Sequence, residues 1–223
     1  MSLFEDWIND ELGTGVLRFY VVMIPTTRDR LLPALIAGHG DLALGGLTIT
    51  PERAALVDFS DPLMRDVSEI VVTGPAAAPL TTVDDLSGRE VYVRESSSYH
   101  ASLTALNERF ETSGRPPMTL TLAEEYLEDE DLLEMLDSGL IETIVVDQHK
   151  AEFWDQIFDN ITLHPDAAVR EHGAIATAFR KNSPQLADVV NRFVAEHRQG
   201  TLMGNIILRR YLQDTTRVRN AFS

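Results

Sequence analysis

The sequence predicts an α/β protein of two lobes, each a sheet with helices packed against it. Segments rich in β-forming residues alternate with amphipathic helical segments, which favours parallel sheets covered on both faces. The alternation is interrupted at one linker, Gly74–Pro79, and then starts again. A chain of 223 residues, 44% of them hydrophobic, can bury a core in each of two small lobes. We expect lobe 1 to comprise residues 1–78 and 171–223, and lobe 2 to comprise residues 79–170.

The first lobe opens with a helical pattern. Apolar residues of one helical face run from Phe4 to Leu12, and Gly13 ends the helix. The run Val16–Ile24 is rich in β-forming residues and predicts a buried strand. Thr26 with Asp29 three residues later resembles a capping box that starts the next helix. The elements expected after it are a strand at 41–47, a short helix capped by Thr50 with Pro51 in its first turn, and a strand at 67–73.

Beyond the linker the same alternation of strands and helices returns. We expect strands at 91–94, 118–122, 141–146 and 173–179. Helices are expected at 98–110, around 132–136 with an end at Gly139, from Ser183 onward, and over 202–211. A ligand of such a protein would lie in the crevice at the carboxyl ends of the strands.

Composition excludes several classes of function. A net charge of -16 repels nucleic acid, so no nucleic-acid partner is expected. The chain has no cysteine, which removes disulfides, thiolate nucleophiles and cysteine metal sites. No apolar run approaches the length of a membrane span. The sequence begins Met-Ser-Leu and enters a helical pattern at once, so we expect any signal peptide to lie outside it.

The first candidate ligand segment joins a buried strand to a helix start. Gly45 and Gly46 allow a close approach of the backbone to a ligand. Arg53 falls in the first helical turn, where a cation opposes the helix dipole. An anion held between its guanidinium and the first-turn amides would explain that position. The alternative is an ordinary ion pair of Arg53 with Asp58 or Asp61.

Two further candidates also follow strands. The segment Ser96–Tyr99 offers hydroxyls and amides at a helix start, with plain N-capping as the alternative. Asp147 directly follows an apolar strand, with a helix N-cap as its alternative. Arg53 and Asp147 would present opposite charges from two lobes, which matches an α-amino acid.

Signals for catalysis or metal binding are weak, and we expect no cofactor and no metal. The six histidines form no metal-binding spacing. No phosphate loop, dinucleotide fingerprint or nucleophile elbow occurs. The acidic run 124–131 lacks the EF-hand glycine and spacing, so it predicts a solvated helix start.

The segment 41–64, DLALGGLTITPERAALVDFSDPLM, resembles the signature of the periplasmic solute-binding proteins of the polar amino-acid class, family 3. The resemblance continues through GREVYVRESSSYHASL to the last helices and implies a periplasmic-binding-protein type II fold, two α/β lobes joined by a hinge. It implies a carboxylate site at Arg53, with the Thr48 hydroxyl and Gly46 beside it. It also implies that Ser97 and Ser98 contact the carboxylate and that Asp147 holds the α-ammonium.

The tail resembles the sensor domain that precedes the catalytic domain in membrane-bound lytic transglycosylase F and its relatives. The residues that carry this resemblance are GTLMGNI at 200–206, RRYL at 209–212, and Asn220-Ala221. It implies a periplasmic binding module for an amino acid or cell-wall peptide, with an ABC transporter permease or a fused transglycosylase domain as partner. The catalytic domain would follow this sequence, so we expect no cell-wall cleavage from it.

Two departures from the family pattern shape the expectations. Glycines at 45 and 46 stand where many relatives have serines, so fewer hydroxyls would contact the ligand. The family's first strand, central in its first lobe, lies outside this sequence. Its two neighbours, at 16–24 and 41–47, would lack a partner. Either they pair with each other, or a segment of a second molecule adds a strand between them. We favour strand addition, and so expect a homodimer, or impaired ligand binding by this chain, or both.

Two other functions fit the same resemblance. Cyclohexadienyl dehydratases use this fold and a similar glycine pair, and they need a carboxylic acid in the cleft as general acid. The ligand domain of a signalling receptor is the third interpretation.

Overall fold

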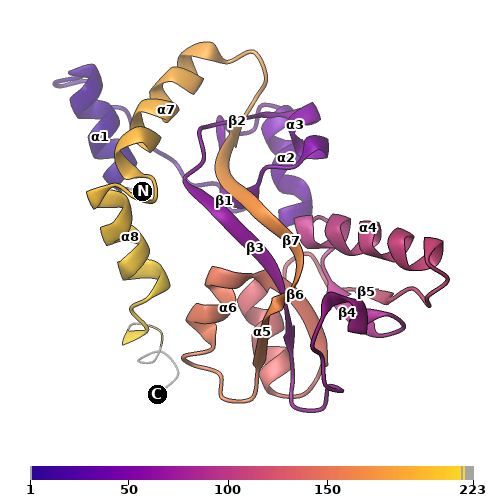
Figure 1. Cartoon of the computed structure of the whole chain (residues 1–223). Coiled ribbons are helices and arrows are strands. Elements are labelled where there is room, and N and C mark those ends of the chain that lie inside the picture. Colours follow the sequence, from indigo (N-terminus) through magenta and orange to yellow (C-terminus); the bar gives the residue numbers. More distant parts are fainter. Residues whose placement is uncertain (1, 217, 219–223) are drawn as a thin grey trace. The chain divides into compact units, whose positions relative to one another are not determined.

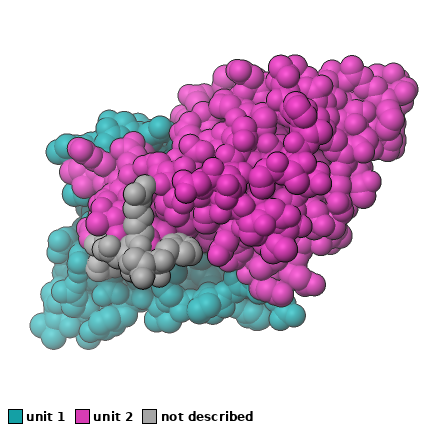
Figure 2. Space-filling view, turned by 90° about the horizontal axis from the view of Figure 1, so that it is seen from below, with its two compact units in different colours: residues 1–64, 175–205 teal, residues 65–174, 206–223 magenta. Residues whose placement is uncertain are grey.

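The computed structural model describes residues 2–216 and 218, which form two compact units. Unit 1 comprises residues 1–64 and 175–205, and unit 2 comprises residues 65–174 and 206–223 (Figure 2). Asn220 and Ala221, which carry part of the tail resemblance, lie outside the described residues. The strands β3 (Met64–Thr73) and β7 (Thr162–Phe179) carry the chain from one unit to the other (Figure 1).

Unit 1 is a small sheet with helices around it. Its elements are α1 (Ser2–Leu12), α2 (Arg28–Ile36), β1 (Leu42–Thr48), α3 (Pro51–Leu56), β2 (Asp58–Phe59), the end of β7, and α7 (Pro184–His197). Both β1 and β2 pair antiparallel with the end of β7. Leu35, Leu47, Val57 and Ala178 are core residues of this unit. In Figure 1, α1 lies beside α7, because the rings of Phe4 and Trp7 pack edge-on against Phe193.

Unit 2 holds a larger sheet in the strand order β7-β3-β6-β4-β5. Its elements after β3 are a 3₁₀ turn (Val83–Leu86), β4 (Glu90–Val93), α4 (Ser98–Thr112), β5 (Thr119–Leu122), α5 (Asp129–Asp137), β6 (Thr143–Asp147) and α6 (Gln148–Trp154). β4 is parallel to β5 and β6, whereas β3 and β6 are antiparallel. α8 (Leu202–Leu212) runs across the boundary of the units. Within the described residues, no helix is long and apolar enough to cross a membrane.

Local sequence rules predicted most of these elements. Thr50 caps α3, with its Oγ1 accepting from the Arg53 amide at 3.3 Å, and Pro51 occupies the first turn. Gly13 has a φ of +58°, as a glycine that ends a helix should. The capping box at Thr26 is wrong, because Thr27 is the N-cap of α2 and makes no side-chain capping bond. β7 starts at Thr162, eleven residues before the strand predicted at 173.

The predicted buried strand at 16–24 is wrong. The described chain has no regular structure there, and its apolar side chains other than Val21 are exposed, from 54% at Phe19 to 99% at Val16. Asn9, itself 5% exposed, binds both main-chain groups of Phe19: its Nδ2 donates to the carbonyl at 2.9 Å and its Oδ1 accepts from the amide at 2.8 Å. β1 is the end strand of the described sheet. A strand needs a neighbouring ladder, and the run 16–24 pairs with none of the described strands.

The core of unit 2 supports a stability prediction. Leu133 on α5 is fully buried, and Leu133→Ala removes the packing of its Cγ and both Cδ atoms, so we expect a loss of about 2–5 kcal/mol. Leu140→Ala, at a side chain 72% exposed, should change stability by less than about 0.5 kcal/mol. Urea unfolding of both variants measures the difference. Equal midpoints would contradict the assigned core.

Candidate functional site: a strand-end arginine and a buried carboxylate network

The predicted carboxylate segment of unit 1 is built on the end of β1. Thr48 ends that strand at 3% exposure, and Gly46 has a φ of +65°, where a side chain would be strained. Arg53, half-buried in the first turn of α3, donates from Nη1 to the Thr48 carbonyl at 3.0 Å. The structure therefore brings Arg53 and Thr48 together. Sequence reasoning missed Arg28, whose guanidinium donates to the Gly45 carbonyl.

The second predicted segment starts α4 in unit 2. Ser97 is the N-cap: its Oγ accepts from the His100 amide at 3.2 Å and donates to the Arg94 carbonyl at 2.7 Å. Ser98, the first helical residue, is buried at 6% exposure. The plain N-capping alternative thus accounts for the Ser97 hydroxyl in this ligand-free chain.

Asp147, the last residue of β6, is only 1% exposed. It precedes α6 but forms no side-chain capping bond, so the N-cap alternative does not account for its carboxylate. Its Oδ2 lies 3.2 Å from Lys150 Nζ. Its Oδ1 is buried and has no hydrogen-bond partner among the described residues. A buried acceptor in this state costs about 1–3 kcal/mol, so the second oxygen needs a physical explanation.

A network of charges surrounds Asp147. Tyr99 Oη accepts from the Asp147 amide at 3.2 Å and donates to Asp129 Oδ2 at 3.2 Å. Asp129 also accepts from Lys150 Nζ at 2.6 Å and from the Arg94 guanidinium. Arg94 and Asp129 are 4% and 5% exposed. The solvated start predicted for the acidic run is therefore wrong at Asp129, which is a buried ion-pair partner.

Burial tunes two titratable groups in this network. It raises the pKa of the Tyr99 hydroxyl well above its usual value, and the charges of Asp129 and Asp147 raise it further. Tyr99 therefore remains a neutral donor and acceptor at ordinary pH. Burial also lowers the pKa of His149, and this outweighs the opposing effect of Asp147. His149 thus adds little positive charge near Asp147 at neutral pH.

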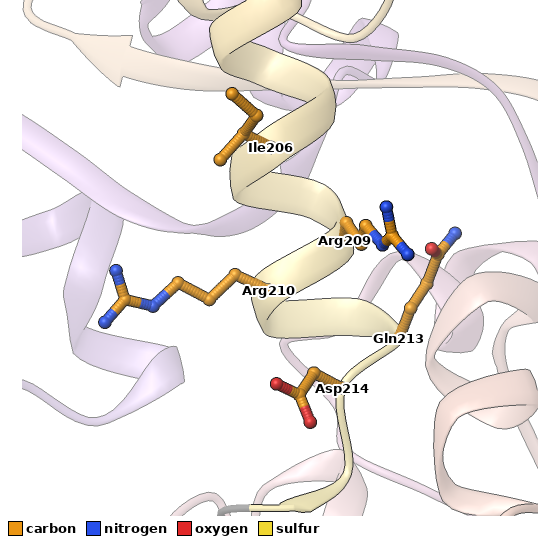
Figure 3. A pocket seen from close by; sticks show the side chains of 5 residues that line it. All are labelled: Ile206, Arg209, Arg210, Gln213 and Asp214. Carbon is orange, nitrogen blue, oxygen red and sulfur yellow. The ribbon is translucent and has the colours of Figure 1, made fainter.

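In the described part of the chain, no three side chains of His, Cys, Asp or Glu are grouped so as to hold a metal ion. A hollow of about 670 Å³ lies against α8, lined by Ile206, Arg209, Arg210, Gln213 and Asp214 (Figure 3). Figure 3 shows Arg209 and Arg210 pointing away from each other along one helix. None of the predicted ligand residues lines this hollow.

A family model described as bacterial extracellular solute-binding proteins, family 3, matches residues 6–213. This chain belongs to that family.

The curated relatives include two kinds of protein. Membrane-bound lytic murein transglycosylase F of Maricaulis maris is 32% identical over 55% of this chain and 25% of its own length. The protein of that name from Saccharophagus degradans is 28% identical over 73% of this chain and 30% of its own. The L-cystine-binding protein TcyJ of Escherichia coli is 28% identical over 80% of this chain and 63% of its own. The chain thus spans less than two thirds of each of these relatives.

Solved structures show the same fold, the periplasmic-binding-protein type II architecture. The substrate-binding protein of an amino acid ABC transporter is 22% identical, with a TM-score of 0.73 over 96% of this chain and 87% of that chain. An ancestral arginine-binding protein bound to arginine is 21% identical, with a TM-score of 0.73 over 94% and 85%. AncCDT-1, an ancestral amino acid-binding protein and a precursor of cyclohexadienyl dehydratase, is 23% identical, with a TM-score of 0.67 over 94% and 84%. The two-lobed α/β fold class predicted from sequence is confirmed.

The buried network supports a prediction about charge and stability. Asp129→Asn leaves the Arg94 guanidinium buried without its main counter-charge, so we expect a loss of about 3–5 kcal/mol. The control is Asp84→Asn, which breaks exposed pairs with Arg109 and Arg115 and should cost at most about 1 kcal/mol. Denaturant unfolding compares the two. Similar losses would mean that the network does not stabilise unit 2.

Proposed function

We propose that the chain captures a small zwitterionic ligand, an amino acid or a cell-wall peptide, in the periplasm and catalyses no reaction. Support comes from the family match over residues 6–213 and from relatives named for binding arginine or cystine. The proposed lobes are residues 1–78 with 171–223, and residues 79–170. Each would contribute one set of ligand contacts.

The observation that carries this proposal is the unpartnered oxygen of Asp147. Evolution retains a buried, unsatisfied carboxylate oxygen mainly where function needs it, because it destabilises the ligand-free chain. An ammonium group has three donors and no acceptor, so a ligand ammonium would satisfy Oδ1 with a charge-assisted hydrogen bond. Asp147 is therefore the proposed ammonium acceptor.

The carboxylate of the ligand is assigned to the arginine segment and the start of α4. A guanidinium can bind a carboxylate through two parallel hydrogen bonds, and the Thr48 carbonyl anchors Arg53 by one nitrogen. Thr48 and Gly46 adjoin it on β1, and Ser97 and Ser98 contribute the amides of a helix start. We expect these groups to share one ligand with Asp147.

Two settings fit the proposed module. It serves as the receptor of an ABC transporter permease, or it regulates a transglycosylase domain fused to it. A permease gene beside the full gene distinguishes the first setting, and a catalytic domain in the same reading frame distinguishes the second. In either setting we expect no conversion of the cyclohexadienyl ring of arogenate or prephenate to an aromatic ring when the chain is assayed as a dehydratase.

A thermal-shift screen against amino acids and cell-wall peptides tests the binding proposal. A ligand at about 100 times its Kd stabilises a protein by about 2.7 kcal/mol. Arg53→Ala should weaken binding by about 1.5–3 kcal/mol, and Asp147→Asn by at least as much, because each removes a charged hydrogen bond. The control is Asp66→Asn, at a side chain 85% exposed. A screen without any stabilising ligand, or full affinity in both variants, would contradict the proposal.

The exposed run Val16–Ile24 and the end strand β1 support a second expectation, self-association. Every copy of the chain carries an exposed run of strand-forming residues that pairs with no described strand. Every copy also carries β1, an end strand with one unpaired edge. The run of one copy can therefore add to the β1 edge of another. We propose that two copies pair through them as a homodimer. Light scattering should then give twice the single-chain mass. Val22→Asp should lower it toward that of one chain, whereas Leu140→Asp, at an equally exposed leucine of unit 2, should not. A monomer at every concentration would rule this out.

A further inference from the structure

Glu69 is a second buried carboxylate on the same sheet as Asp147. It lies on β3 at 1% exposure and is the cross-strand partner of Asp147 in the antiparallel β3–β6 pair. Directly opposed residues project to the same face of a sheet, with Cβ atoms about 4.5–5.5 Å apart. Two negative charges in this arrangement repel each other, so the pair destabilises the ligand-free fold.

Each of the two carboxylates has one oxygen with a close polar partner and one oxygen without a hydrogen bond. Ser102 Oγ donates to Glu69 Oε2 at 2.5 Å, and Lys150 Nζ lies 3.2 Å from Asp147 Oδ2. Glu69 Oε1 and Asp147 Oδ1 are the two buried side-chain oxygens without a hydrogen-bond partner in the described residues. Arg170 Nη1 forms an ion pair with Glu69 Oε1 at 3.7 Å, which is too long for a hydrogen bond. Both unsatisfied acceptors therefore occur on one cross-strand pair.

The cations beside this pair lie closer to solvent than the acids. The side chains of Lys150 and Arg170 are 23% and 26% exposed, against 1% for Glu69 and 2% for Asp147. Long, flexible side chains of this kind can move without unfolding the sheet. They pair with the acids at 3.2 and 3.7 Å, and a ligand cation can take their place.

We infer that Glu69 and Asp147 together form a two-carboxylate site for one primary ammonium group of the ligand. The inference rests on the proposed function and deepens it, because it makes Glu69 a specificity-determining residue. One ammonium can donate to both unsatisfied oxygens and separate the two negative charges. A ligand whose amine is acylated keeps only one donor and loses its charge, so the site rejects it.

The decisive variant is Glu69→Gln. The glutamine carbonyl keeps an acceptor for Ser102, and its amide can donate to Asp147 Oδ1. We therefore expect the melting temperature of the ligand-free chain to rise by about 2–4 °C, as for a gain near 1 kcal/mol in a chain of this size. If Glu69 serves only to hold Arg170 and Ser102, the melting temperature falls instead, and the inference is overturned. Glu142→Gln, an exposed acid of unit 2, controls for the change in net charge.

Calorimetry completes the test with the free L-amino acids and their Nα-acetyl derivatives as probes. The wild-type chain should bind free amino acids and not the acetylated forms. Glu69→Gln should weaken binding by about 10- to 150-fold, the loss of one charged hydrogen bond. Equal affinity in wild type and Glu69→Gln overturns the acid pair and leaves the proposed function standing. Absence of binding in the wild type, both of amino acids and of the cell-wall peptides of the thermal-shift screen, overturns the proposed function itself.

Discussion

Unit 2 depends on hydrogen bonds and ion pairs to two buried carboxylates, those of Asp129 and Asp147. Asp129 begins α5 and Asp147 immediately precedes α6, while Tyr99 in the first turn of α4 contacts both. The network thus ties three helix starts to the end of β6. Helix N-termini favour negative charge, and Arg94 and Lys150 supply the rest of the compensation. This arrangement satisfies Asp129 fully and leaves Asp147 and Glu69 each with one oxygen unsatisfied.

The difference in hydrogen bonding distinguishes the structural carboxylate, Asp129, from the two carboxylates proposed to bind ligand, Asp147 and Glu69. Asp129 accepts from Arg94, Lys150 and Tyr99, so its burial is explained within the fold. Asp147 and Glu69 are as deeply buried and less well compensated. Such incomplete pairing favours ligand binding, because a ligand ammonium then supplies the hydrogen bond that the buried carboxylate oxygen lacks. The family membership of the chain gives this feature a natural role in holding the positive end of a solute.

Sequence patterns predicted the features that depend on residues close to one another in the chain. The cap at Thr50, the helix end at Gly13 and the strand that leads to Asp147 depend on neighbours within a few residues, and the structure shows all three. Sequence reasoning failed where pairing or burial depends on residues far away in the chain. Val16–Ile24 has strand-forming residues but no ladder, and Asp129 is buried only because Arg94 lies opposite it. Glu69 was missed because an acid in a β-rich run is read as a solvent-facing residue. Its place opposite Asp147 follows only from strand register.

The central claim is that the unsatisfied oxygen of Asp147 receives a ligand ammonium. An experimental structure of the chain with an amino acid that stabilises it tests this most directly. The account predicts the ligand nitrogen about 2.7–3.2 Å from Asp147 Oδ1, within the range of a charged hydrogen bond. A ligand bound elsewhere, with Asp147 still paired only to Lys150, would contradict it.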